Sequence, residues 1–119
     1  MPLSLSPAPD MLKTVRSYLE AEILPNLRDA QWFNLRVALN ILAMVERELR
    51  FGAALDAAAL ERLTALLGRD GTLPELNRAL AEAIRAGAIA DDDPELLRHL
   101  ERSTREALEI NNPNWIANP

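Results

Sequence analysis

Residues 33–45, FNLRVALNILAMV, are the stretch that decides the fold. Their apolar side chains cover nearly every direction around a helix axis, whereas a surface helix confines such residues to one stripe. A helix that is apolar almost all round is normally enclosed by other elements. The pattern therefore predicts a central helix from about Asp29 to Phe51, on the order of 33 Å long, that ends at Gly52.

The flanking segments predict further helices. Asp10 can cap an earlier helix, which ends at Pro25 because proline cannot donate to the preceding turn. Three more helices are expected to begin at Asp56, at Thr72 and at the acidic run 91–93 before Pro94, and the last is expected to bury Leu96, Leu97, Leu100 and Leu108. No segment alternates with the period of a strand. The prediction is an all-α, single-domain bundle of about five helices around the long central second helix.

The chain ends differ from this helical body. Residues 1–9 contain three prolines and are expected to form a flexible lead-in, followed by a single helical domain over residues 10–119. The sequence from about residue 111 predicts an irregular tail. Trp115 and Ile116 lie in that tail and either fold back onto the bundle or bind another chain, since large aromatic residues are favoured interface anchors. Trp32, at the start of the central helix, raises the same question.

Composition excludes several classes of function. The 119 residues include no cysteine and one histidine, which removes disulfides, thiolate nucleophiles and most zinc sites. A net charge of −5 disfavours nucleic-acid binding, because an acidic chain repels phosphate. No apolar run is long enough for a membrane span and no signal peptide is recognisable, so a cytoplasmic location is expected. No cofactor, no metal and no catalytic constellation are predicted.

The central helix carries three polar residues on one stripe. Arg36, Asn40 and Arg47 fall at positions i, i+4 and i+11 of an otherwise apolar segment. In one interpretation the arginines pair with carboxylates of neighbouring helices and Asn40 binds a backbone group. In the other, Arg36 and Asn40 line a pocket for a small anionic ligand, because the planar guanidinium suits carboxylate or phosphate.

Two other groups of polar residues are predicted to lie on solvated faces. Glu46 and Glu48 flank Arg47 near the predicted helix end, where local pairing in solvent is expected. His99 shares its helical face with three charged residues, Glu95, Arg102 and Glu106. We therefore expect it to be exposed, without a catalytic or metal-binding role.

Four stretches together resemble a known family: RVALNILAMVERE at residues 36–48, LGRDGTL at 67–73, LN at 76–77 with AIRAG at 83–87, and INNPNW at 110–115. They are similar to a bacterial domain family of unknown function, over nearly everything from Met11 to Ile116. Its members are small, helical and often encoded beside aminoglycoside-phosphotransferase-like kinases and acyl-CoA dehydrogenases. The resemblance implies that metabolic context and no catalytic residue.

Two functional hypotheses follow. The first is a non-catalytic accessory domain that binds a protein, either a second copy of itself or a metabolic enzyme, through residues such as Trp32, Trp115 and Ile116. The second is a small-molecule binding module in which Arg36 and Asn40 hold an anion. An enzyme that uses His99 or a carboxylate ranks last.

Overall fold

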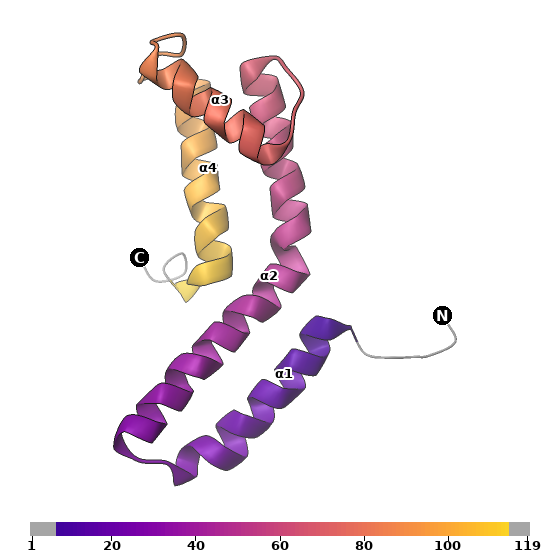
Figure 1. The fold of residues 1–119 in the computed structure, drawn as a ribbon, viewed down its shortest axis with the longest axis vertical. Coiled ribbons are helices and arrows are strands. Elements are labelled where there is room, and N and C mark those ends of the chain that lie inside the picture. Colours follow the sequence, from indigo (N-terminus) through magenta and orange to yellow (C-terminus); the bar gives the residue numbers. More distant parts are fainter. Residues whose placement is uncertain (1–6, 115–119) are drawn as a thin grey trace, which may run out of the picture. The chain divides into compact units, whose positions relative to one another are not determined.

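The computed structural model describes residues 7–114, and these residues are helical without any strand. Helix α1 (Ala8–Tyr18) continues through a π-helical turn, η1 (Leu19–Ile23), and a 3₁₀ turn, η2 (Leu24–Asn26). The long helix α2 (Asp29–Leu67) follows, and then α3 (Leu73–Arg85) and α4 (Pro94–Asn111), as Figure 1 shows. The predicted all-α fold with a long second helix is confirmed.

Helix α2 differs from the prediction because it does not end at Gly52. It continues through Asp56 for 39 residues and so joins the predicted second and third helices into one. Glycine in a helix interior costs only about 1 kcal/mol relative to alanine, and residues 53–59 are rich in alanine, the strongest helix former. The helix ends instead at Leu67, and Gly68 follows it with a φ of 68°, the left-handed conformation that often terminates a helix.

The predicted starts of the last two helices are confirmed at atomic detail. The Thr72 hydroxyl caps α3 by accepting from the Glu75 amide at 3.3 Å, and it donates to the Glu75 carboxylate at 2.8 Å. Asp93 caps α4 by accepting from the Leu96 amide at 3.0 Å. Each cap satisfies a backbone amide that has no partner within its helix.

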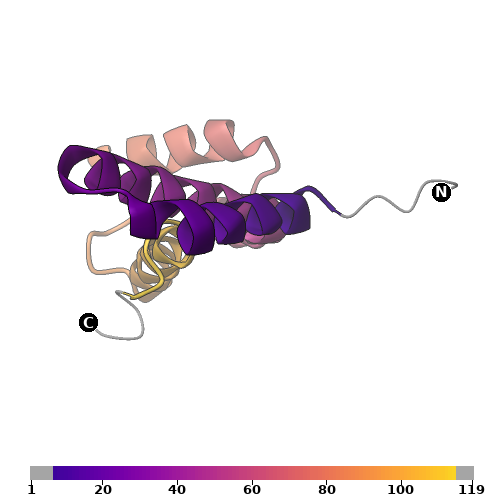
Figure 2. The ribbon, with the colours of Figure 1, turned by 90° about the horizontal axis from the view of Figure 1, so that it is seen from below.

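The chain forms two compact units that meet in sequence between Gly52 and Ala53, inside α2. In the first unit, α1 and the first part of α2 are antiparallel neighbours, which Figures 1 and 2 both show. Ion pairs join α1 and its continuation η1 to α2 in reversed order: Asp10 to Arg50, Arg16 to Glu46 and, from η1, Glu20 to Arg36. We call this unit the hairpin. The expectation of one domain over residues 10–119 stays a prediction.

The second unit contains the larger apolar core. Leu63 of α2, Leu76 and Leu80 of α3 and Leu96 of α4 form a buried cluster. Partly buried residues surround it: Leu60, Leu66, Leu67, Leu73, Ile84 and Ile89. Leu97 and Leu100 were expected in this core, but they are 49% and 44% exposed, because α4 turns Leu96 and His99 inward instead.

The expected enclosure of residues 33–45 is wrong. Leu39 is fully buried, but Phe33 is 61% exposed and Ile41 is 53% exposed. The reason is that within the hairpin α1 covers one side of α2 and leaves the opposite side uncovered. The all-round apolar pattern therefore does not correspond to all-round burial.

Candidate functional site

A cleft in the second unit is the first candidate site. It lies between α2, the loop after α3, and α4, with a volume of about 1220 Å³. That volume exceeds the roughly 300–1,000 Å³ typical of small-molecule pockets. Its lining holds four arginines and four carboxylates, so no net charge selects an anion or a cation. These are Arg62, Arg98, Arg102, Arg105, Glu61, Asp93, Glu95 and Glu101.

A polar network joins α2 to α4 at this cleft, centred on Arg62. Its guanidinium contacts both oxygens of Glu106, with Nη2 at 2.6 Å from Oε1 and Nη1 at 3.1 Å from Oε2. The Glu106 side chain is only 8% exposed. Arg62 Nε also donates to Nδ1 of His99 at 3.2 Å, and Nη2 donates to the Ser103 hydroxyl at 3.4 Å. One arginine thus binds three residues of α4.

His99 is buried in this network, contrary to the expectation that it is exposed. Burial lowers the pKa of His99, the charge of Arg62 lowers that pKa further, and Glu106 opposes part of the shift. Because Nδ1 accepts the hydrogen bond from Arg62, the neutral ring carries its proton on Nε2. The sequence could not reveal this environment, since Arg62 is 37 residues away.

This tautomer argues against a Ser–His nucleophile. Ser103 Oγ lies 3.5 Å from His99 Nε2. A general base would need a free lone pair on that nitrogen to take the hydroxyl proton. With Arg62 on Nδ1, Nε2 carries hydrogen and cannot accept it. The geometry thus supports a structural tie between two helices rather than an activated serine.

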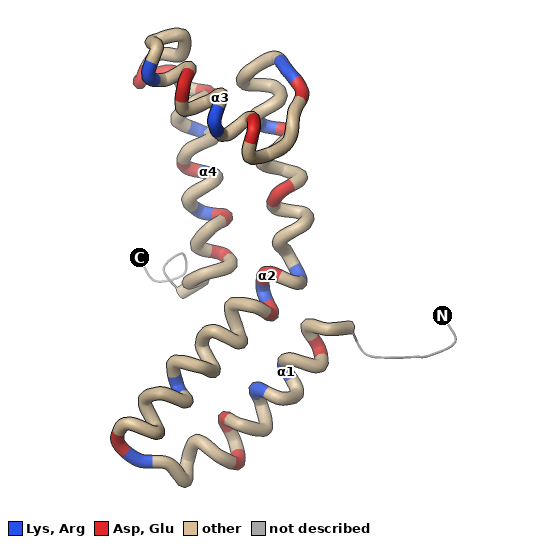
Figure 3. The backbone as a smooth tube through the Cα atoms, in the orientation of Figure 1, with Lys and Arg blue, Asp and Glu red and all other residues tan. Residues whose placement is uncertain are grey.

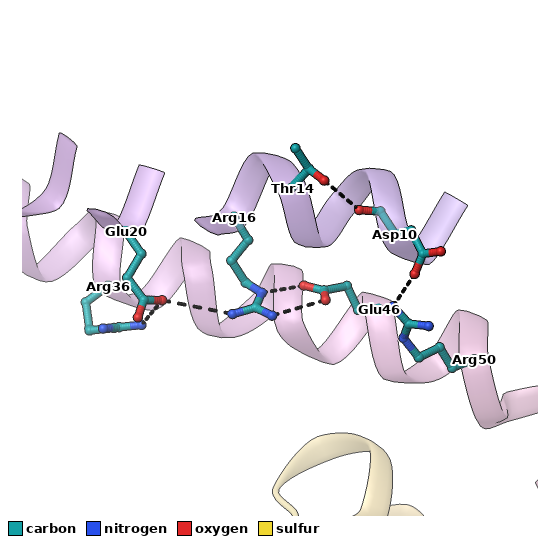
Figure 4. A network of polar contacts seen from close by, with 7 residues as sticks. All are labelled: Asp10, Thr14, Arg16, Glu20, Arg36, Glu46 and Arg50. Carbon is teal, nitrogen blue, oxygen red and sulfur yellow. Dashed lines mark hydrogen bonds and ion pairs between the residues drawn. The ribbon is translucent and has the colours of Figure 1, made fainter. Parts of the chain in front are cut away.

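A second polar network runs along one side of the hairpin (Figure 4). Arg16 of α1 donates from Nε to Oε2 of Glu46 and from Nη2 to Oε1 at 3.1 Å. Glu46 is buried, so its predicted place on a solvated face is wrong. The hydrogen bonds from Arg16 lower the pKa of Glu46 more than burial raises it.

The predicted anion pair, Arg36 and Asn40, lies near this network. Arg36 Nη2 is 3.3 Å from Oε2 of Glu20, in a pair that is about 34% and 45% exposed. This is the structural alternative: an arginine bound to a carboxylate of the neighbouring helix. Asn40 is exposed, so its expected burial is wrong, while Arg47 is half-buried. The proposed anion pocket stays a prediction, without the enclosed surroundings on which it was based.

Exposed apolar side chains are concentrated in the hairpin. Among the described residues, twelve large apolar side chains are exposed, and ten of them belong to residues 7–52. Those ten are Met11, Val15, Tyr18, Trp32, Phe33, Val37, Ile41, Val45, Leu49 and Phe51. Trp32, a predicted partner-binding residue, is 42% exposed. The other two predicted partner-binding residues, Trp115 and Ile116, lie outside the described residues.

Five of these side chains share one side of the hairpin. On α1 they are Met11, Val15 and Tyr18, about 100° around the helix from the stripe that faces α2. On α2 they are Val45 and Leu49, displaced by about 90° in the same sense from Leu39 and Glu46. A local two-fold axis relates antiparallel neighbours, so displacements of the same sense emerge on the same side. We call these five residues the hairpin apolar face.

The ion pairs occupy the other side of the hairpin. By helical periodicity, Asp10, Glu20, Arg36 and Arg50 are displaced in the opposite sense around their helices. Figure 4 shows how they pair across the hairpin. The two sides therefore differ in chemistry. One side is stabilised by ion pairs between the two helices, and the other, the hairpin apolar face, presents apolar side chains.

Two kinds of feature are absent from the described residues. No described helix is both long and apolar enough to cross a membrane. Within residues 7–114, no three His, Cys, Asp or Glu side chains are grouped so that they could hold a metal ion.

The chain matches a known protein family. A family model described as a domain of unknown function, DUF6285, matches residues 25–115. The match includes η2 and all of α2, α3 and α4, whereas α1 precedes it. Neither a curated protein nor a solved structure matches the chain significantly. The match confirms the resemblance to a family of unknown function.

Proposed function

The chain belongs to the DUF6285 family, and we propose that it works as a non-catalytic accessory domain that binds another protein through the apolar side chains of its hairpin. One observation carries the proposal. The chain has five aromatic residues, and all four that lie within the described part are exposed. Their exposed fractions are 58% for Tyr18, 42% for Trp32, 61% for Phe33 and 48% for Phe51.

Aromatic exposure on this scale favours an interface. A folded chain normally buries its largest apolar side chains, because each aromatic ring removes about 150–250 Å² from water. Here the buried core is built from leucines of the second unit. Aromatic residues are enriched at the centres of protein interfaces and dominate their binding energy. Scattered exposed apolar residues are ordinary, but here ten lie within 46 residues, and five of them share one side that a partner would desolvate.

The polar networks support a role without catalysis. Arg62, His99 and Glu106 satisfy one another across α2 and α4, and Arg16 and Glu46 do the same within the hairpin. Each of these charged groups is held by a neighbour in the folded protein. The resemblance implies a partner class, namely enzymes of acyl-CoA or phosphotransferase chemistry.

The proposal is tested by binding measurements with the purified enzymes encoded beside the gene. We expect at least one enzyme, or the protein itself, to associate with the wild type, and Tyr18→Ser to weaken that association at least tenfold. Leu97→Ser is the matched control, since Leu97 is also about half exposed but belongs to α4. The proposal fails if the wild type binds neither, or if the two substitutions weaken binding equally.

A further inference from the structure

We propose that the hairpin apolar face pairs with the same face of a second copy, so that two hairpins form a four-helix bundle. The proposal rests on the interaction role proposed above and names one partner for it. Met11, Val15, Tyr18, Val45 and Leu49 define the surface, and their exposed fractions lie between 41% and 58%. The paired helices are two copies of α1 and two copies of the first part of α2.

The hairpin buries few apolar side chains by itself. Among its described residues, the buried apolar side chains are Leu24 and Leu39. Two antiparallel helices cover each other along a single seam, which leaves the rest of each apolar stripe in water. A bundle of four helices gives every helix two neighbours and encloses a core. A second hairpin, laid on the hairpin apolar face, supplies this arrangement.

The charge distribution favours contact between two hairpins over contact between two second units. Residues 7–52 contain six acidic and six basic side chains, so their net charge is zero. Residues 53–119 contain twelve acidic and seven basic side chains and therefore hold the whole net charge of −5. Figure 3 shows the two signs interspersed along the hairpin. Two hairpins can approach without net repulsion, whereas two second units would repel each other.

The apolar area of this face determines how strong a dimer we expect. Tyr18 supplies about 120 Å² if it is 58% exposed, and the four aliphatic side chains supply about 50 Å² each. The resulting 320 Å² or so per copy, at about 65% apolar, corresponds to roughly 1,000 Å² buried in total. That is the lower bound for a specific interface. We therefore expect a reversible dimer with a dissociation constant in the micromolar range.

Two valine-to-lysine variants test whether the hairpin apolar face forms the dimer contact. Val45 lies on the hairpin apolar face and is 41% exposed, whereas Val37 is 40% exposed on the outer side of the same helix. The wild type, Val45→Lys and Val37→Lys are compared by sedimentation velocity of the full chain from about 1 to 500 µM. Circular dichroism confirms that each variant keeps its helical content.

The expected result is a monomer–dimer equilibrium for the wild type. Val45→Lys should weaken it at least tenfold, because each copy would bring a lysine into the apolar contact, and Val37→Lys should leave it within about twofold. A wild type that stays monomeric throughout overturns the dimer, as does a dimer that Val45→Lys leaves unchanged. If the monomer instead binds a neighbouring enzyme in a manner sensitive to Val45→Lys, the dimer falls and the proposed accessory role stands.

Discussion

Replacing Arg62 by methionine should destabilise the second unit strongly. Methionine keeps much of the side-chain length but removes the charge that holds Glu106, whose carboxylate is 8% exposed. Breaking one partner of a buried ion pair costs about 3–5 kcal/mol, because the remaining buried charge loses its main partner. Here Arg102 Nε, 3.8 Å from Oε2 of Glu106, remains as a second partner, but its side chain is 64% exposed. Arg62 itself is 25% exposed, so we expect the lower end, about 3 kcal/mol. That is a substantial part of the 5–15 kcal/mol typical of a domain.

The double variant Arg62→Met with Glu106→Leu tests whether the loss of stability in Arg62→Met comes from the unpaired charge of Glu106. It removes both charges, and an apolar pair of similar volume is often neutral relative to a buried ion pair. We expect its free energy of unfolding to recover to within about 1 kcal/mol of the wild type, because His99 loses only one hydrogen-bond donor. The assay is urea unfolding followed by circular dichroism at neutral pH and at one fixed protein concentration.

A surface pair on the same helix provides the control. Arg98 is hydrogen bonded to Glu95, and the two side chains are 68% and 70% exposed. Arg98→Met should therefore cost less than about 1 kcal/mol. If Arg62→Met costs no more than Arg98→Met, or if the double variant is less stable than Arg62→Met alone, the assignment of Arg62 as the tie between α2 and α4 is wrong.

Three further outcomes are expected. The fold lowers the pKa of His99, so its contribution to stability is complete above about pH 6.5 and is lost as the pH falls toward the folded-state pKa. Nuclear magnetic resonance should give the single imidazole a midpoint below 6.5, and a midpoint at or above that value would contradict the burial described for it. Gly52→Ala should raise the free energy of unfolding by about 0.5–1 kcal/mol, since α2 is helical there and the flexible Glu48 carboxylate can move aside; a loss of stability in urea titrations would mean that the helix is interrupted. Thr72→Ala should lower the free energy of unfolding by about 1 kcal/mol through loss of the cap, and an unchanged urea midpoint would refute that role.

Local chemistry explains which parts of the fold were predictable. Thr72 with Glu75, Asp93 with Pro94, and Gly68 each mark a helix boundary through residues a few positions apart. Such signals depend on backbone groups that every helix end leaves unsatisfied, so they are readable without knowledge of the fold. Gly52 produced the wrong prediction of a helix end for the same reason. It is a local signal of helix termination, but the alanine-rich sequence after it continues the helix at a small cost.

Long-range pairing explains what the sequence could not supply. Glu46 and Arg16 are 30 residues apart, and Arg62 and Glu106 are 44 residues apart. Every charged residue in these pairs has several oppositely charged candidates in the chain, and periodicity alone cannot choose among them. For this reason Glu46 and His99 were predicted to be solvated, although both are buried. Arg62 shares a helical face with Leu66, four residues later, and a basic residue beside an apolar stripe was the one signal of a carboxylate partner.

The apolar pattern of residues 33–45 connects the missed prediction to the proposed function. An all-round apolar helix predicts neighbours on every side, yet in the hairpin α1 covers one side, and Val37, Ile41 and Val45 remain 40–53% exposed. Solubility does not explain these exposed residues. Each half-exposed side chain keeps apolar area in water, which costs about 25 cal/mol of stabilisation per Å². A neighbour that desolvates them recovers that free energy. We therefore attribute the exposed apolar residues to contacts that the isolated hairpin lacks. For Val45 the contact we propose is a second hairpin, whereas Val37 and Ile41 lie outside that contact and would need a different neighbour.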